Sequence, residues 1–194
     1  MLRQNKRIIL SSKSPRRQSL LKGLEIKFEV VVHDVEEIYP KTLPVEKVPE
    51  YLARLKAEPF LKDLDSNTVV ITSDTVVLLN GKVLGKPKDE EDAKRMLKSL
   101  SGNKHQVVTG VCLTEKDKQN SFSSVTDVCF DKISETEINY YFQHFKPLDK
   151  AGSYGIQEWI GYAKIQKIEG CYYNVMGLPL RDLYLKMIDL GIVS

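Results

Sequence analysis

The segment TVVITSDTVVLLNGKVL, residues 68–84, constrains the fold more than any other part of the sequence. Thr68–Ser73 and its continuation Thr75–Leu79 are rich in β-branched and aliphatic residues, which favours a long buried strand. The Asn80-Gly81 pair that follows is typical of a two-residue hairpin turn, and the KVL after it predicts a returning strand. The chain is therefore expected to build a sheet that contains at least one hairpin.

Further strands and helices are predicted on both sides of this segment. The other strand-like runs are Arg7–Leu10, Phe28–Val32, Gln106–Thr114, Phe122–Phe130, Tyr162–Ile168 and Tyr172–Met176. The helix-like runs are Pro15–Gly23 with Ser14 as its N-cap, Val48–Leu64 with a break near Glu58 at Pro59, the run from Asp89 to Ser101, Ser134–Phe145 with a Ser134/Glu137 capping box, and Leu180–Leu190. Because strands and helices neither alternate strictly nor segregate, we expect a three-layer α/β protein with a mixed sheet.

Size and composition favour an ordinary globular protein. With 194 residues, 42% of them hydrophobic and 28% charged, we expect one domain spanning residues 1–194. A net charge of +3 is too small to indicate a nucleic-acid partner. The three cysteines are far apart and form no CxxC pair, which favours neither a disulfide framework nor a zinc site. No apolar run suits a signal peptide or a membrane span, so we expect a cytoplasmic protein without a membrane partner.

The stretch SSKSPRRQSLL, residues 11–21, places serines and two arginines at a predicted helix start. A helix N-terminus offers unpaired backbone N–H groups and the positive end of the helix dipole, and arginine adds forked donors that match phosphate oxygens. These features predict a phosphate site. A well-capped surface helix with solvated arginines is the alternative interpretation that this stretch leaves open.

Carboxylates and lysines follow other predicted strands and helices. The run His33-Asp34-Val35-Glu36-Glu37 groups three acids, which suits a divalent cation or else a solvated loop. Asp74 immediately follows the buried run Val69–Ser73 and suits a general base or a metal ligand, with a turn-capping role as the alternative. Lys56 and Lys86 are candidate phosphate-neutralising cations among many lysines. Together these groups indicate a magnesium-dependent enzyme that acts on a phosphate ester.

Six blocks of the sequence resemble the Maf family of nucleotide pyrophosphatases. The blocks are SSKSPRRQSLL, the acidic VEE loop, SDTVVLLNGKVLGKP, LSGNKHQVVTGV, LDKAGSYGIQ and IEGCYYNVMGLPL. The resemblance implies an elongated mixed sheet like that of the inosine triphosphate pyrophosphatases, with a substrate cleft between two lobes. It also implies hydrolysis of a nucleoside triphosphate to the monophosphate and pyrophosphate with a divalent metal, Mg²⁺ or Mn²⁺, and a homodimer.

The resemblance also implies roles for individual residues. Asp74 matches the proton acceptor or metal-organising carboxylate, and Glu37 matches the loop acid, with Glu36 as a possible substitute. The implied metal ligands are thus Glu37 and Asp74, and the implied catalytic set also includes Lys56 and Lys86. Ser12, Ser14 and Arg17 match the phosphate-binding corner of the family.

Three further positions match the branch of the family that prefers dTTP and UTP. Arg16, Thr75 and Gln157 stand where the branch acting on 7-methyl-GTP usually carries Trp, Gln and Glu. A glutamine can pair with the imide edge of a pyrimidine through both its donor and its acceptor, which agrees with this assignment. The sequence leaves open whether the nucleotide is a standard or a modified pyrimidine.

Some residues depart from the family pattern, and other functions stay open. Lys13 stands where glycine is frequent, Pro59 lies inside the predicted helix after Lys56, and Cys171 replaces a more usual serine. The alternatives are a 7-methyl-GTP pyrophosphatase, a non-catalytic regulator of septum formation and cell division, and an RNA-binding protein. The basic corner is too short, and too near acids, to follow a nucleic-acid backbone, so we expect no nucleic-acid partner.

Overall fold

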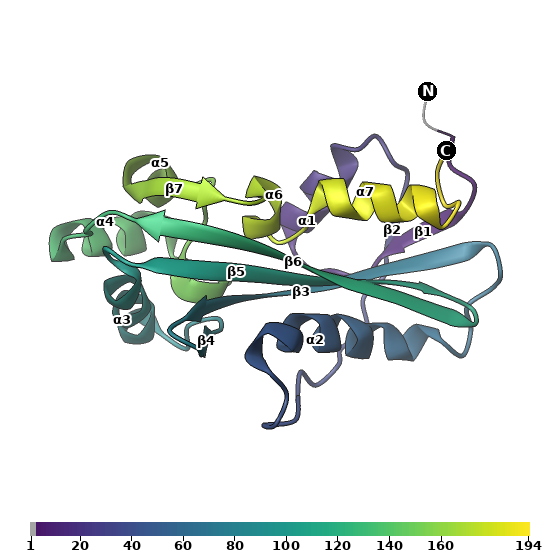
Figure 1. The fold of residues 1–194 in the computed structure, drawn as a ribbon, viewed down its shortest axis with the longest axis horizontal. Helices are drawn as coiled ribbons and strands as arrows, with labels where there is room; N and C mark the ends of the chain where they lie inside the picture. Colours follow the sequence, from purple (N-terminus) through teal and green to yellow (C-terminus); the bar gives the residue numbers. More distant parts are fainter. Residues whose placement is uncertain (1–2) are drawn as a thin grey trace. The chain divides into compact units, whose positions relative to one another are not determined.

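The computed structural model describes residues 3–194, which build a mixed seven-stranded sheet with helices around it (Figure 1). The strands occur in the order β2-β1-β3-β5-β6-β7, and β4 pairs with β3. Their bounds are Arg7–Leu10 (β1), Glu29–Val30 (β2), Thr68–Leu79 (β3), Lys82–Leu84 (β4), Lys104–Glu115 (β5), Lys118–Phe130 (β6) and Ile165–Glu169 (β7). β1 is parallel to β2 and β3, whereas β4 and β7 pair antiparallel with β3 and β6. The predicted α/β class with a mixed sheet is confirmed.

The chain divides into two compact units. The first comprises Met1–Asp74, Thr109–Ser124 and Gly177–Ser194, and the second comprises Thr75–Val108 and Val125–Met176. The boundary therefore falls between Asp74 and Thr75, inside the segment that the sequence marks as one long strand. A single domain over residues 1–194 stays a prediction, as does a cleft between two lobes.

The first unit contains helices α1 (Pro15–Lys22), α2 (Val48–Ala57) and α7 (Leu180–Asp189), and the 3₁₀ turns η1 (Val45–Lys47) and η2 (Glu58–Phe60). Within this unit, Figure 1 shows α2 on one face of the strands and α7 on the other. The Ser14 side chain accepts a hydrogen bond from the backbone N–H of Arg17, and α1 begins at Pro15, as predicted. The break predicted at Pro59 is also confirmed, because α2 ends at Ala57 and η2 follows.

Close contact between α2 and β5 depends on Gly110. A Cβ atom at this position would lie 2.2 Å from the backbone nitrogen of Glu50 and 2.3 Å from the carbonyl carbon of Pro49. Any side chain there would push the helix away from the strand. On β3, the buried Thr72 hydroxyl donates to the carbonyl oxygen of Ala53 at 2.6 Å, which ties the same helix to a second strand. These contacts fix the height and rotation of α2 over the sheet.

The second unit has its own apolar core and three further helices of note, α3 (Glu90–Leu100), α4 (Glu135–Phe145) and α5 (Trp159–Lys164). Asp89 caps α3, and Ser134 and Glu137 form the predicted capping box of α4. The hairpin predicted at Asn80-Gly81 is present, with both residues at positive φ. The core residues include Val77, Leu97, Leu100, Val107, Val128, Phe130, Ile138, Tyr141, Tyr154 and Ile160.

One predicted strand is wrong and another begins later than predicted. Tyr172–Val175 forms the short helix α6 instead of a strand, whereas the strand predicted at Tyr162–Ile168 is present as β7 but starts only at Ile165, because residues 159–164 form α5. In α6, the side-chain amide of Asn174 donates to the carbonyl oxygen of Val107 and to the hydroxyl of Thr126. These buried bonds hold a tight turn where the tyrosines and the valine would otherwise favour a strand.

The remaining differences concern the lengths of strands. β2 is limited to Glu29–Val30, shorter than the predicted run. β5 and β6 extend toward each other until only Lys116 and Asp117 separate them, so both strands are longer than the predicted runs Gln106–Thr114 and Phe122–Phe130. None of the helices in residues 3–194 combines the length and apolar character needed to traverse a lipid bilayer.

Candidate functional site

The first unit contains seven of the ten predicted site residues. They are Ser12, Ser14, Arg16, Arg17, Glu37, Lys56 and Asp74, and the second unit contains Thr75, Lys86 and Gln157.

An ion-paired cluster of Lys56, Asp74 and Glu37 is the main polar feature of the first unit. The ammonium nitrogen of Lys56 lies 2.6 Å from Oδ1 of Asp74 and 3.0 Å from Oε1 of Glu37. The side chains of Lys56 and Asp74 are 18% and 12% exposed, whereas that of Glu37 is 46% exposed. Two carboxylates that the sequence separates by a long loop and a helix thus meet on one lysine.

Strand and helix periodicity explain why Lys56 and Asp74 meet. Side chains two residues apart on a strand share a face, so Asp74 lies on the same face of β3 as Thr72. Thr72 bonds to Ala53 of α2, and Lys56 lies three residues further along the helix on the same side. The packing of α2 on the strands therefore carries Lys56 directly to Asp74.

The carboxylate pair has the donor set that a phosphate-bound divalent cation requires. No group of three or more His, Cys, Asp or Glu residues that could hold a metal ion occurs in residues 3–194. Magnesium, however, usually takes only one or two protein carboxylates and completes its octahedron with phosphate oxygens and water. Glu37 and Asp74 fit a cation of this kind, and their two carboxylates exceed the single ammonium of Lys56 in formal charge.

The serines of the predicted phosphate corner bind the turn into α1. The hydroxyl oxygen of Ser14 accepts from the backbone N–H of Arg17 at 3.4 Å, and that of Ser12 accepts from the backbone N–H of Ser14 at 3.2 Å. A hydroxyl that accepts one hydrogen bond still has a proton to donate. Both serines can therefore cap the turn and donate to an anion at the same time.

The Arg17 side chain reaches from α1 to two backbone carbonyl groups. Its Nε donates to the carbonyl oxygen of Gly177 at 2.8 Å, and its Nη1 donates to that of Ser73 at 3.0 Å. Burial lowers the pKa of Arg17, and the charge of Arg16 acts in the same direction, while Asp74 and Glu37 oppose both. Arg17 thus belongs to the same electrostatic cluster as the carboxylates.

Lys13, the unusual residue of the corner, pairs with the acidic loop. Its ammonium lies 2.6 Å from Oδ1 of Asp34, and both side chains are exposed. The bond to Lys13 lowers the pKa of Asp34. An exposed pair of this kind contributes little to stability, but it ties the segment that carries Glu37 to the corner.

In the second unit, a buried network holds the segment that carries Gln157. Lys150 pairs with Glu158 at 3.1 Å, the Tyr141 hydroxyl donates to Glu158, and the same hydroxyl accepts from the backbone N–H of Gly155 at 2.9 Å. Burial and then the bond to Glu158 raise the pKa of Tyr141. This supporting network was not predicted, although the block LDKAGSYGIQ contains Lys150 and Gly155.

The predicted site residues of the second unit differ in exposure. Lys86 is exposed, and the neighbouring carbonyl oxygen of Gly85 accepts from the backbone N–H of Gly152 at 3.0 Å. This bond ties the loop of Lys86 to the segment that leads to Gln157. The side-chain oxygen Oε1 of Gln157 is buried and has no hydrogen-bond partner within residues 3–194. Such an oxygen is an open acceptor for a ligand N–H group.

Two of the histidines pack against aromatic rings. His105 is buried, its Nε2 lies 2.7 Å from the hydroxyl oxygen of Tyr154, and desolvation lowers its pKa to about 4. His33 packs edge-on against the ring of Phe60, with ring centroids 4.6 Å apart. Both histidines are packing residues in this structure.

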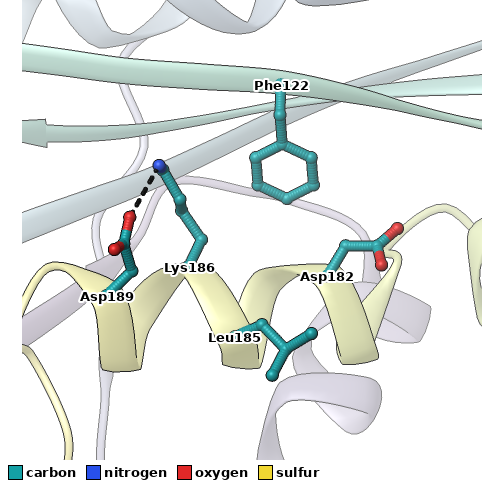
Figure 2. Close-up of a pocket in the computed structure, with 5 residues that line it drawn as sticks. All are labelled: Phe122, Asp182, Leu185, Lys186 and Asp189. Atoms are coloured by element: carbon teal, nitrogen blue, oxygen red, sulfur yellow. Dashed lines mark hydrogen bonds and ion pairs between the residues drawn. The ribbon is translucent and has the colours of Figure 1, made fainter.

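Figure 2 shows a pocket between β6 and α7 in the first unit. Phe122 points from the strand toward the helix, and Lys186 pairs with Asp189 at 2.9 Å along its rim. The lining residues are Phe122, Asp182, Leu185, Lys186 and Asp189. None of the predicted site residues lines this pocket, so it is separate from the cluster around Asp74.

The first unit thus combines a helix start rich in donors with two carboxylates that share a lysine, an arrangement that can bind a phosphate group together with a divalent cation. Comparison with known protein families identifies the family of the chain. The model of the Maf family, described as Maf-like protein, matches residues 7–189. The chain therefore belongs to the Maf family.

Homologous proteins match the chain over most of its length. The dTTP/UTP pyrophosphatase of Porphyromonas gingivalis strain W83 is 52% identical over 188 residues, which is 95% of this chain and 94% of that protein. The dTTP/UTP pyrophosphatase of Flavobacterium psychrophilum is 49% identical over 186 residues, 96% of this chain and 95% of that protein. Among solved structures, the Ham1 protein of Staphylococcus aureus is similar with a TM-score of 0.48 and 22% identity, over 64% of this chain and 72% of that one.

Proposed function

We propose that the chain is a nucleoside triphosphate pyrophosphatase that converts dTTP and UTP to the monophosphate and pyrophosphate. The observation that carries the proposal is the pairing of Lys56 with both Asp74 and Glu37 beside the donor-rich start of α1. Two relatives with 52% and 49% sequence identity are named dTTP/UTP pyrophosphatases, which supports the same reaction and the same nucleotides.

Hydrolysis of the triphosphate depends mainly on the positions and the charges of the groups around it. The oxygen of a water molecule attacks the α-phosphorus, the bond from that phosphorus to the oxygen bridging to the β-phosphorus breaks, and pyrophosphate leaves with the electron pair. Asp74 orients the water and accepts its proton. Its low exposure and its contact with Lys56 hold the carboxylate in one place, as an efficient general base requires.

Cationic groups hold the triphosphate chain. The hydroxyl groups of Ser12 and Ser14 donate to phosphate oxygens from the start of α1, where the backbone N–H groups and the helix dipole also favour an anion. Arg17, Lys56 and Lys86 add positive charge in this proposal. Charge that develops on the leaving oxygen is stabilised by such groups, usually the largest catalytic contribution.

Glu37 and Asp74 would hold a divalent cation, Mg²⁺ or Mn²⁺, with Glu36 as the alternative loop acid. When bound, such a cation supplies charge neutralisation to the phosphate oxygens. The two carboxylates are the only protein ligands in this proposal.

Arg16, Thr75 and Gln157 select the base. The unpartnered Oε1 of Gln157 accepts the N3–H of uracil or thymine, and its Nε2 donates to a neighbouring carbonyl oxygen of the base. A hydrogen-bonding site of this kind discriminates strongly, because the wrong base leaves a buried polar group unpaired. Standard and modified pyrimidines that keep this imide edge are both included in the proposal.

A panel of nucleoside triphosphates tests the function. Pyrophosphate release and the identity of the monophosphate are measured with Mg²⁺, with Mn²⁺ and after chelation of metal. We expect the highest kcat/KM for dTTP and UTP and loss of turnover on chelation. A preference for 7-methyl-GTP would move the chain to the other branch, and no turnover of any nucleotide would favour a non-catalytic role in cell division. Light scattering of the same samples checks the proposed homodimer.

A further inference from the structure

The edge of β3 changes its hydrogen-bond partner at the point where β1 ends. β1 pairs in parallel with β3 as far as Leu10 and Ile71, and the backbone N–H of Ser11 donates to the carbonyl oxygen of Ile71 at 2.9 Å. Carbonyl groups two residues apart on a strand point to the same side. The next carbonyl on this edge is that of Ser73, and it accepts from Nη1 of Arg17 at 3.0 Å. The side chain of Arg17 therefore continues the ladder that β1 begins.

The guanidinium of Arg17 also donates a hydrogen bond to a second backbone carbonyl group. Nε of Arg17 donates to the carbonyl oxygen of Gly177 at 2.8 Å. Gly177 has a φ of 106°, a conformation that glycine adopts without strain, and it precedes α7. One planar group thus joins the start of α1, the middle of β3 and the entry to α7, all within the first unit.

Fixing the carbonyl of Ser73 also fixes the next residue. The peptide bond is planar, so the orientation of the Ser73 carbonyl sets the plane that leads to Cα of Asp74. Ser73 is almost fully buried, and Asp74 lies against Lys56. The bond from Arg17 therefore holds the peptide plane from which Cα of Asp74 continues.

We propose that Arg17 is a positioning residue for Asp74, which acts by clamping the backbone of Ser73 against Gly177. This inference rests on the proposed hydrolysis and adds a role to the one that the phosphate corner already gives Arg17. It predicts that the shape of the guanidinium matters and not only its charge. Lysine keeps the positive charge but has a single ammonium on a flexible stem and cannot span two carbonyl groups in one plane.

The kinetics of the Arg17→Lys variant distinguish a positioning role of Arg17 from a role in phosphate binding. Arg181→Lys, on the exposed surface of α7, is the matched control. We expect kcat for dTTP to fall about 10- to 100-fold, the scale of loss for a misplaced catalytic group. We expect the Kd of a non-hydrolysable α,β-imido analogue of dTTP to change by less than about threefold, since the charge is kept. An unchanged kcat, or a loss of kcat/KM that weaker binding of the analogue explains in full, would overturn the proposal.

A double-mutant cycle tests whether Arg17 acts through Asp74. In the Asp74→Asn background, Arg17→Lys should lower the residual kcat by less than about twofold, because the group that it positions is already disabled. Losses that multiply in full would show that the two residues act independently and would contradict the inference.

A spectroscopic measurement needs no turnover and so separates this inference from the proposed function. The ¹³C resonance of the Ser73 carbonyl and the amide resonances of Asp74 should shift in Arg17→Lys and stay in place in Arg181→Lys. If both proteins give the wild-type resonances, the clamp is not formed in solution. If the resonances shift but the wild-type protein hydrolyses no triphosphate, the clamp stands and the proposed function fails.

Discussion

The ammonium group of Lys56 lies 2.6 Å from the carboxylate of Asp74, and this pair joins α2 to β3. The same ammonium contacts Glu37 from the acidic loop, so one cation lies between two acids. The arrangement shows how a carboxylate that is nearly buried is kept in a fixed position. It also places a protein cation where the proposed reaction brings a metal ion.

Replacement of Lys56 by methionine is expected to strengthen metal binding by the nucleotide-free protein. Without the ammonium, the carboxylates of Glu37 and Asp74 have no cation between them, and a divalent ion relieves their repulsion. We expect Lys56→Met to bind Mn²⁺ at least about tenfold more tightly than wild type in calorimetry or electron paramagnetic resonance. Lys56→Met with Glu37→Gln should lose the gain, and equal affinities in all three proteins would contradict this account.

Exchange of the base-selecting residues is expected to change the preferred nucleotide. Arg16→Trp, Thr75→Gln and Gln157→Glu are combined in one variant, and kcat/KM is measured for dTTP, UTP and 7-methyl-GTP. Because Gln157→Glu removes a donor and adds a charge, the ratio for pyrimidines over 7-methyl-GTP should fall at least about tenfold. A ratio that stays at its wild-type value while the melting temperature is kept would remove these residues from base selection.

Stability is expected to fall in mild acid because of His105. Its pKa is lowered to about 4 by burial, whereas the unfolded chain has the ordinary value near 6.5. The unfolded state thus binds the proton first, so stability is full above about pH 6.5 and declines as the pH falls toward 4. The loss amounts to roughly 3 kcal/mol. Urea unfolding at pH 7 and 4.5 checks it, and His105→Gln should show a smaller difference between the two pH values than wild type.

Gly110→Ala is expected to destabilise the protein through α2. The added methyl group meets the backbone of Glu50 at 2.2 Å, so the helix must move, at a cost of about 1–3 kcal/mol or more. Because α2 carries Lys56, kcat should fall as well. Gly85→Ala is the matched control, since a Cβ there meets nothing within 4 Å, and its urea midpoint should stay near wild type. Equal midpoints for the two variants would refute the close packing of α2 on β5.

Local features of the fold were predictable from the sequence because their causes are local. The cap and proline at the start of α1, the capping box of α4 and the Asn-Gly hairpin each rest on residues within a few positions. The helix at Tyr172–Val175 was missed because distant groups decide it: the side chain of Asn174 is held by Val107 and Thr126. In the helix at Trp159–Lys164, a Cβ at Gly161 would lie 1.7 Å from the carbonyl oxygen of Ile156, a close backbone contact that no sequence pattern marks.

The candidate site was predictable in its residue types but not in its contacts. Charged groups at the ends of strands and helices indicated phosphate chemistry, and the family resemblance assigned roles. That Lys56 contacts both acids depends on how α2 packs on β3 and β5 through Thr72 and Gly110. The bonds of Arg17 end on backbone carbonyl groups, which every residue has, so no sequence pattern marks them.

The most direct measurement of the central claim is pyrophosphate release from dTTP by wild type and Asp74→Asn in Mg²⁺, with dTMP identified as the second product. Asparagine keeps the size of the side chain but cannot take the proton of the attacking water, so kcat should fall by about two orders of magnitude or more. Asp117→Asn in the exposed turn between β5 and β6 serves as the control and should keep wild-type turnover. A folded Asp74→Asn protein that releases dTMP and pyrophosphate at the wild-type rate would contradict the account.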